Sequence, residues 1–155
     1  MSLRRMKEPI RGRSQAGTHR RLDPLSKAQR SERMTRVRSR DTKPEMVLRK
    51  LVFSLGYRYR LHDARLPGRP DLVFSSRRCV IFMHGCFWHQ HGCETYKQPA
   101  SRTWFWSRKL TSNVLRDQEV GKRLASAGWR SLVVWECELR SNPETIAWKV
   151  IRFLQ

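Results

Sequence analysis

An unbroken apolar run, Cys79-Val80-Ile81-Phe82-Met83, is the feature that most limits the possible folds of this chain. Turn residues at 75–78 precede the run, and His84-Gly85 ends it. A segment this short that is apolar at every position is typical of a strand buried on both faces. Such a strand lies inside a sheet, so the sequence predicts a sheet that helices cover.

The segments around this run predict the other elements of the fold. A capping-box arrangement begins a helix at 43–55, where Thr42 precedes Pro44 and Glu45. The other predicted elements are strands at 57–61, 71–74 and 129–135, the last of them buried, a helix whose apolar stripe runs from Leu110 to Ala127, and a helix at 143–154. The first three strands can form a meander, so the predicted fold class is α/β, with a mixed β-sheet flanked by helices.

The charge balance indicates a polyanionic partner. The 155 residues, enough for one domain, include 33 Lys and Arg against 13 Asp and Glu, a formal net charge of +20. Solubility needs far less charge than this, so nucleic acid is the expected partner. No stretch approaches the roughly 18 to 20 apolar residues of a membrane helix, and the N-terminus lacks the apolar core of a secretory signal. We therefore expect a soluble, cytoplasmic protein.

The basic charge is concentrated near the N-terminus. Residues 1–40 contain thirteen Lys and Arg and three acidic residues, a net charge of +10, and no aromatic residue. We predict a disordered basic arm at 1–28 and a folded domain at 29–155. The arm either binds phosphates, or only adds solubility, or is not translated, since Met34 is an alternative start.

A short segment after the central strand has the composition of a metal site. Two thiols and two imidazoles lie within residues 86–93, and Cys137 at the end of the other apolar strand could add a further ligand. Zinc held by three cysteines and one histidine is the natural product of such a set. The spacing favours zinc over unbound thiols but is not the usual pair of CxxC knuckles. We interpret Cys79, inside the strand, as a small core residue.

The same strand end predicts a second, catalytic site. Antiparallel pairing of the strands at 71–74 and 79–83 places Asp71 near the end of the central strand. Three histidines follow that strand, and if the cysteines bind zinc, two of these histidines are not zinc ligands. A carboxylate for a hard cation and an imidazole to deprotonate water are the parts of metal-assisted phosphodiester hydrolysis. Each residue has another interpretation: Asp71 could cap a turn and His84 could be a core histidine. Glu45, judged alone, is better explained by its capping box.

Large aromatic residues lie among basic ones in two places. Phe87-Trp88 occupies the cysteine-rich loop, and Trp104-Phe105-Trp106 is flanked by Arg102, Arg108 and Lys109. This mixture suits stacking on bases or wedging between them. Core packing is the alternative, which we favour for Phe105, whereas we expect Trp88 to be exposed.

Four blocks of this sequence resemble the very-short-patch-repair (Vsr) DNA mismatch endonucleases. They occur in that family's order and span about residues 30 to 140: SRDTKPE at 39–45, LPGRPD at 66–71, CVIFMHGCFWH at 79–89 and LVVWEC at 132–137. Two positions differ from the family pattern. Met83 stands where the family has Thr, and the second acidic residue and Lys of PD-(D/E)xK nucleases are not visible after Asp71.

The resemblance implies a restriction-endonuclease-like core, a variant of the PD-(D/E)xK superfamily. It implies a Mg²⁺-dependent nick on the 5′ side of the thymine in a T:G mismatch, the product of 5-methylcytosine deamination. The implied catalytic roles are Asp71 and the backbone carbonyl of Met83 as Mg²⁺ ligands, His89 as general base, and His84 and Glu45 as partners acting through metal-bound water. The implied structural zinc ligands are Cys86, His91, Cys93 and Cys137. The implied wedge residues are Phe87, Trp88 and Trp106.

The expected partners are double-stranded DNA with a T:G mismatch and mismatch-repair accessory proteins. One nick needs one active site, so we expect a monomer. Two other functions remain open: a related nuclease of a restriction or mobile-element system, and a zinc-stabilised DNA-binding module without catalysis.

Overall fold

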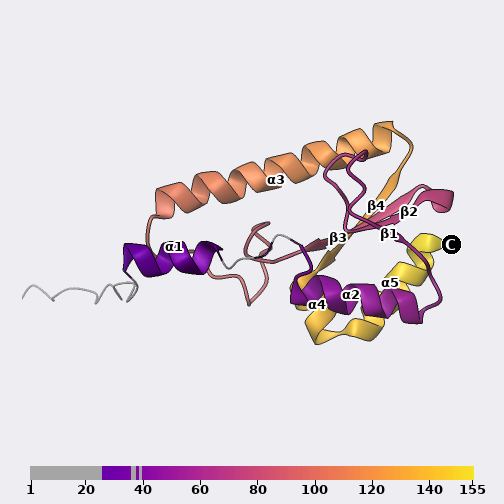
Figure 1. Ribbon diagram of the computed structural model, residues 1–155, viewed down its shortest axis with the longest axis horizontal. Coiled ribbons are helices and arrows are strands. Elements are labelled where there is room, and N and C mark those ends of the chain that lie inside the picture. Colours follow the sequence, from indigo (N-terminus) through magenta and orange to yellow (C-terminus); the bar gives the residue numbers. More distant parts are fainter. Residues whose placement is uncertain (1–25, 36–37, 39) are drawn as a thin grey trace, which may run out of the picture.

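The computed structural model describes residues 26–35, 38 and 40–155 (Figure 1). Along the chain the elements are α1 (Lys27–Thr35), α2 (Lys43–Ser54), β1 (Arg60–Leu61), β2 (Leu72–Phe74), the 3-10 helix η1 (Ser75–Arg77), β3 (Cys79–His84), α3 (Thr103–Ser126), β4 (Arg130–Trp135), α4 (Glu136–Ser141) and α5 (Pro143–Leu154). Among these helices, none has the length and apolar character needed to cross a membrane.

The four strands form one mixed sheet in the order β1-β2-β3-β4. β1 pairs with β2 and β2 with β3 in antiparallel fashion, whereas β3 and β4 are parallel. The predicted meander and mixed sheet are therefore confirmed. The central position of β3 is confirmed too, because Cys79, Val80 and Ile81 are all buried.

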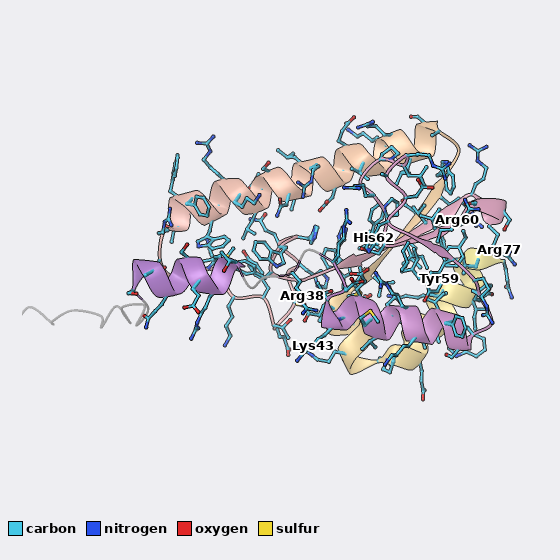
Figure 2. The ribbon with its side chains drawn as sticks, viewed as in Figure 1. Arg38, Lys43, Tyr59, Arg60, His62 and Arg77 are labelled. Atoms are coloured by element: carbon cyan, nitrogen blue, oxygen red, sulfur yellow. The ribbon has the colours of Figure 1, made fainter. Side chains whose placement is uncertain are left out.

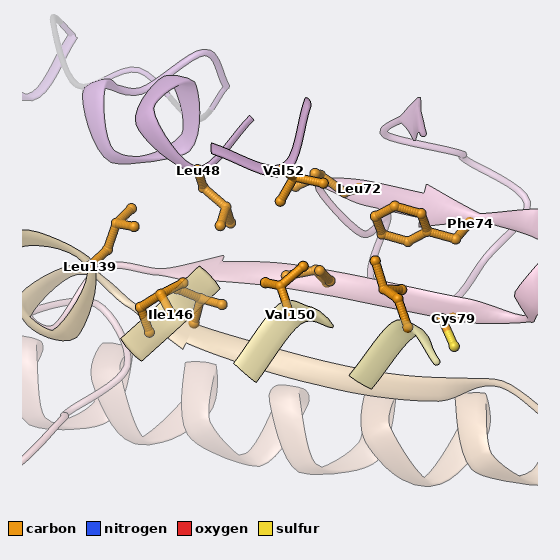
Figure 3. Close-up of a cluster of buried hydrophobic side chains, with 11 residues drawn as sticks. Leu48, Val52, Leu72, Phe74, Cys79, Leu139, Ile146 and Val150 are labelled. Atoms are coloured by element: carbon orange, nitrogen blue, oxygen red, sulfur yellow. The ribbon is translucent and has the colours of Figure 1, made fainter. Parts of the chain in front are cut away.

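Helices cover the two faces of this sheet (Figure 1). The larger core, drawn in Figure 3, packs α2, α4 and α5 against one face through residues such as Leu48, Leu139 and Val150. A smaller core joins Val80 of β3 to Leu124 of α3 on the other face. The apolar residues of α5 recur at helical spacing, so they lie on one side of that helix and pack into the larger core.

Helix α2 begins as the sequence predicts, but its glutamate has a different role. The Thr42 side chain accepts a hydrogen bond from the Glu45 backbone N–H at 3.4 Å, and a proline occupies the first turn. The Glu45 carboxylate does not close a capping box. It is 2% exposed and contacts Arg49 and His62, so the interpretation of Glu45 as a capping residue alone is wrong.

Several boundaries differ from the predicted ones. The first strand is Arg60–Leu61 instead of 57–61, and neither α1 nor α4 was predicted. The apolar run of β4 is not buried throughout: Val134 is buried, whereas Val133, which points to the opposite face of the sheet, is 37% exposed. Most of the predicted basic arm, residues 1–25, lies outside the described residues.

Candidate active site and metal cluster

One cavity gathers all but one of the residues that the sequence analysis assigned to catalysis, the exception being Glu45. It has a volume of about 400 Å³ and lies where β2 begins and β3 ends. Asp71, Met83, His84 and His89 all line it. Basic side chains line it as well, namely Arg40, Arg69 and Arg116. The expected convergence of one carboxylate and two histidines is therefore what the fold produces.

Asp71 is fixed by the pairing of β2 with β3. It precedes Leu72, which lies opposite Ile81, so the Asp71 carboxylate reaches the backbone of β3. Its Oδ2 accepts a hydrogen bond from the Met83 N–H at 2.7 Å. Burial raises the pKa of Asp71 above its ordinary value, an effect that this hydrogen bond opposes. A bound cation would favour the charged form of Asp71 that burial disfavours. A single carboxylate is compatible with Mg²⁺, because this ion takes few protein ligands beside water and phosphate.

The two cavity histidines stack on each other. The ring centroids of His84 and His89 lie 3.7 Å apart at an angle of 10°. Burial, together with the neighbouring His89, lowers the pKa of His84 to about 4, so His84 is neutral near pH 7. His89 Nδ1 contacts the Asp117 carboxylate of α3. A carboxylate accepts a hydrogen bond from Nδ1–H, which leaves His89 Nε2 free to accept a proton.

Asp117 is a site residue that the sequence analysis missed. It lines the cavity and, with His84 and His89, forms one of the groups of side chains close enough to hold a metal ion. A single aspartate on the polar side of a predicted helix carries no local signal, because such residues usually face solvent.

His62 is the second site residue that the sequence analysis missed. Leu61 lies opposite Leu72 in the register of β1 and β2, so His62 lies opposite Asp71. Its Nδ1 is 3.8 Å from Asp71 Oδ1, and its Nε2 is 3.1 Å from Glu45 Oε1. Figure 2 marks the position of His62. Glu45 thus reaches the cavity through His62. The antiparallel register could have revealed His62 from the sequence, had the strand at 57–61 been extended by one residue.

A second cluster, formed by Cys86, His91, Cys93 and Cys137, has the geometry of a zinc site. One ligand atom from each residue lies within 4.8 Å of all the others, and Cys137 Sγ is 3.4 Å from His91 Nδ1. Tetrahedral zinc with ordinary bond lengths separates its sulfur and nitrogen ligands by about 3.6 Å. A hydrogen bond with the Thr95 hydroxyl lowers the pKa of Cys93 to about 6, which favours a thiolate there, whereas burial and the neighbouring thiols raise the pKa of Cys137 to about 12. These donors therefore fit zinc, and Cys79 lies apart from them in the core.

The three predicted wedge residues form one aromatic cluster. The Phe87 ring lies 5.1 Å from Trp88 and 5.2 Å from Trp106, and the two tryptophans are 6.0 Å apart. The buried Asn113 of α3 donates a hydrogen bond to the Trp88 carbonyl at 3.0 Å. Trp88 is half-buried, so the expectation that it is exposed is wrong.

The first turn of α3 is exposed instead. Phe105 is 41% exposed, with the Arg102 guanidinium 4.8 Å above its ring, so the core-packing prediction for Phe105 is wrong. Trp104 is 70% exposed and lies beneath Arg108 at 4.9 Å. Figure 1 shows the reason, because this end of α3 extends beyond the sheet against which Phe105 would have packed.

Comparison with known proteins agrees with the geometry. The family model described as DNA mismatch endonuclease Vsr matches residues 22–95. A type II nicking enzyme, V.XorIIP of Xanthomonas oryzae pv. oryzae, is 53% identical over 117 residues, which cover 76% of this chain and 86% of that protein. The DNA mismatch endonuclease Vsr of Escherichia coli is 51% identical over 120 residues, 77% of each chain. V.NmeAIP of Neisseria meningitidis, another type II nicking enzyme, is 43% identical over 77% of this chain and 86% of its own length. With identities this high over most of both chains, the protein belongs to the Vsr family of DNA mismatch endonucleases.

Proposed function

We propose that this protein is a Mg²⁺-dependent DNA endonuclease that nicks one strand on the 5′ side of the thymine in a T:G mismatch. The observation that carries the proposal is the single cavity in which Asp71, His84 and the His89–Asp117 pair meet. Family membership supports the reaction class, as do the names of relatives that are nicking enzymes and a mismatch endonuclease. We also propose that the core is a variant of the restriction-endonuclease-like fold.

The cavity wall suits a phosphodiester backbone. Arg40, Arg69 and Arg116 supply positive charge beside Asp71, and guanidinium groups bind phosphate oxygens in bidentate fashion. The high net charge of +20 adds a nonspecific attraction to DNA over the whole molecule.

His89 is the proposed general base. Its Nδ1–H is held by Asp117, so Nε2 accepts the proton of the attacking water while the carboxylate stabilises the resulting imidazolium. Asp71 and the backbone carbonyl of Met83 would hold Mg²⁺. When bound, this ion neutralises charge on the scissile phosphate and on the departing oxygen. His84 remains neutral and supports the His89 ring by stacking on it.

Mismatch selection is assigned to the aromatic cluster of Phe87, Trp88 and Trp106. Wedging a ring between bases costs a few kcal/mol of unstacking, and a mispaired step is cheaper to open than a paired one. Trp88 and His89 are consecutive residues, so insertion of the wedge and placement of the base involve one loop. The cysteine–histidine cluster would hold that loop around a structural zinc ion, whose four protein ligands leave no open position for chemistry.

The test compares two duplexes that differ only in one T:G or C:G pair, with and without Mg²⁺. We expect one nick, in the T:G duplex, only with Mg²⁺. Asp71→Ala and His89→Ala should abolish nicking while the thermal midpoint and zinc content stay close to those of the unmodified protein. Glu144→Ala, at an exposed acid in α5, is the matched control and should cut normally. Equal cutting of both duplexes would refute mismatch specificity, and full activity of both site variants would refute the assigned roles.

A second candidate is a nicking function tied to a restriction system, because V.XorIIP and V.NmeAIP are named type II nicking enzymes. The chemistry is the same in both cases, and the difference lies in the sequence around the cut. Profiling nicking on a library of T:G duplexes with randomised flanks, and on fully paired duplexes, separates the two.

A further inference from the structure

His62 adopts a backbone conformation that is uncommon outside glycine. Its φ is +48°, in the left-handed region, where residues other than glycine are uncommon. Its side chain is 17% exposed and lies between α2 and the sheet (Figure 2). Backbone strain of this kind persists where the surroundings enforce it, and it is concentrated at functional sites. The surroundings of His62 are therefore informative.

The contact with Arg49 determines which ring nitrogen of His62 carries the proton. Arg49 Nη2 lies 2.9 Å from His62 Nε2 in hydrogen-bonding geometry. A guanidinium group can only donate, so in this hydrogen bond Nε2 accepts and a proton on Nδ1 completes the ring. Arg49 Nη2 also donates to Glu45 Oε1, which lies 3.1 Å from the same His62 nitrogen, so Arg49 is the group that donates to both. Arg49 is itself held by Asp41 at 2.7 Å and by the Glu45 carboxylate, and these two acids fix its direction.

The protonated nitrogen faces Asp71 from the side opposite Met83. Asp71 Oδ2 is engaged by the Met83 N–H, and its Oδ1 is 3.8 Å from His62 Nδ1. This separation is too long for a hydrogen bond but short enough for an electrostatic interaction that orients the carboxylate. The lone pairs of Oδ1 stay available to a ligand. Asp71 is thus held from both sides without being fully occupied.

We propose that His62 is a positioning residue for Asp71, fixed by Arg49 in its Nδ1–H form so that it orients the carboxylate that would bind the cation. The proposal rests on the role of Asp71 in the proposed function. It assigns His62 no contact with DNA and no transfer of a proton. A purely structural His62 would fill space equally well in either tautomer, whereas a positioning His62 needs its donor on the side of Asp71.

Substitution can separate the two nitrogens. In His62→Asn the amide nitrogen replaces Nδ1, and asparagine tolerates a positive φ. In His62→Gln the amide takes the position of Nε2 and leaves no group facing Asp71. We expect His62→Gln and His62→Ala to lower the nicking rate by about tenfold or more, the equivalent of about 1.4 kcal/mol, and to raise the Mg²⁺ concentration for half-maximal rate. His62→Asn should stay within about threefold. Glutamine matching the unmodified protein, or asparagine as impaired as alanine, would overturn the proposal.

A measurement without metal or DNA tests the same point independently of activity. Long-range ¹H–¹⁵N NMR distinguishes the two tautomers of a histidine ring in the full-length protein. We expect Nδ1–H at His62, and loss of that preference in Arg49→Met. Detection of Nε2–H in the unmodified protein would refute the proposal, whether or not any variant folds.

If Asp71→Ala still nicks DNA, the proposed function fails. If Asp71→Ala is inactive but all three His62 variants cut normally, this inference alone fails.

Discussion

Burial of His84 should make the stability of this protein depend on pH in a predictable way. His84 is 8% exposed and its pKa is lowered from 6.5 to about 4, so the folded state resists protonation at pH values where the unfolded state accepts it. The unfolding free energy is therefore not reduced by protonation of His84 above pH 6.5, and it decreases as the pH falls from 6.5 toward 4. We expect acid to destabilise the protein well before its carboxylates titrate.

The magnitude follows from the two pKa values. At pH 7.5 both states leave His84 neutral and the linkage contributes almost nothing. At pH 5.0 the unfolded ring is almost fully protonated and the folded ring is not, which costs about 2 kcal/mol of unfolding free energy.

The assay is urea unfolding at pH 7.5 and 5.0, followed by tryptophan fluorescence, for the unmodified protein and for His84→Gln. Glutamine does not titrate, so the unmodified protein should lose about 2 kcal/mol more than the variant between these pH values. Zinc content must be measured at both pH values, since release of zinc from thiolates adds a loss that both proteins share. An equal loss in the two proteins would refute the reasoning.

Three further predictions concern other parts of the molecule. Cys137→Ser should release bound zinc and lower the thermal midpoint, and a variant with full zinc occupancy would contradict its role as a ligand. Asp117→Asn should lower the single-turnover nicking rate by roughly 10- to 150-fold, from a lost charged hydrogen bond of about 1.5 to 3 kcal/mol, with DNA affinity unchanged; an unaltered rate would exclude a positioning role. Gly68→Ala should destabilise the fold by about 2 to 5 kcal/mol in urea titration, because its φ is +75° and the new Cβ would lie 2.5 Å from Val120 Cγ1. Gly121→Ala, where a Cβ meets nothing within 4 Å, is the control and should be neutral or stabilising.

The sequence predicted those features that depend on local pattern and on strand pairing. The apolar run at 79–83 was predicted to be central because it is apolar at every position, and Asp71 was placed near His84 because consecutive short strands form meanders. The same logic extends to His62, which needed only the register of one more strand pair.

Features that depend on how a helix is rotated or where it ends were not predictable in this way. Asp117 is 28 residues from His89, and only the docking of α3 on the sheet brings the two together. Phe105 is exposed although we expected it in the core, and Trp88 is half-buried although we expected it to be exposed. Both environments depend on where the first turns of α3 lie. Periodicity indicates that a helix has an apolar side, but it does not indicate how far the helix extends past the surface it covers.

That extension divides α3 into two parts of unequal local stability. The helix has 24 residues and is about 36 Å long. Its later turns rest on the sheet through Val120 and Leu124, whereas its first turns, which carry Trp106, have no strand beneath them. Amide hydrogen exchange should therefore be slow near Leu124 and faster near Trp106, and opening of the early turns needs no unfolding of the sheet. If exchange follows that pattern, one continuous helix combines a half anchored on the sheet with a half that can open while the sheet stays folded.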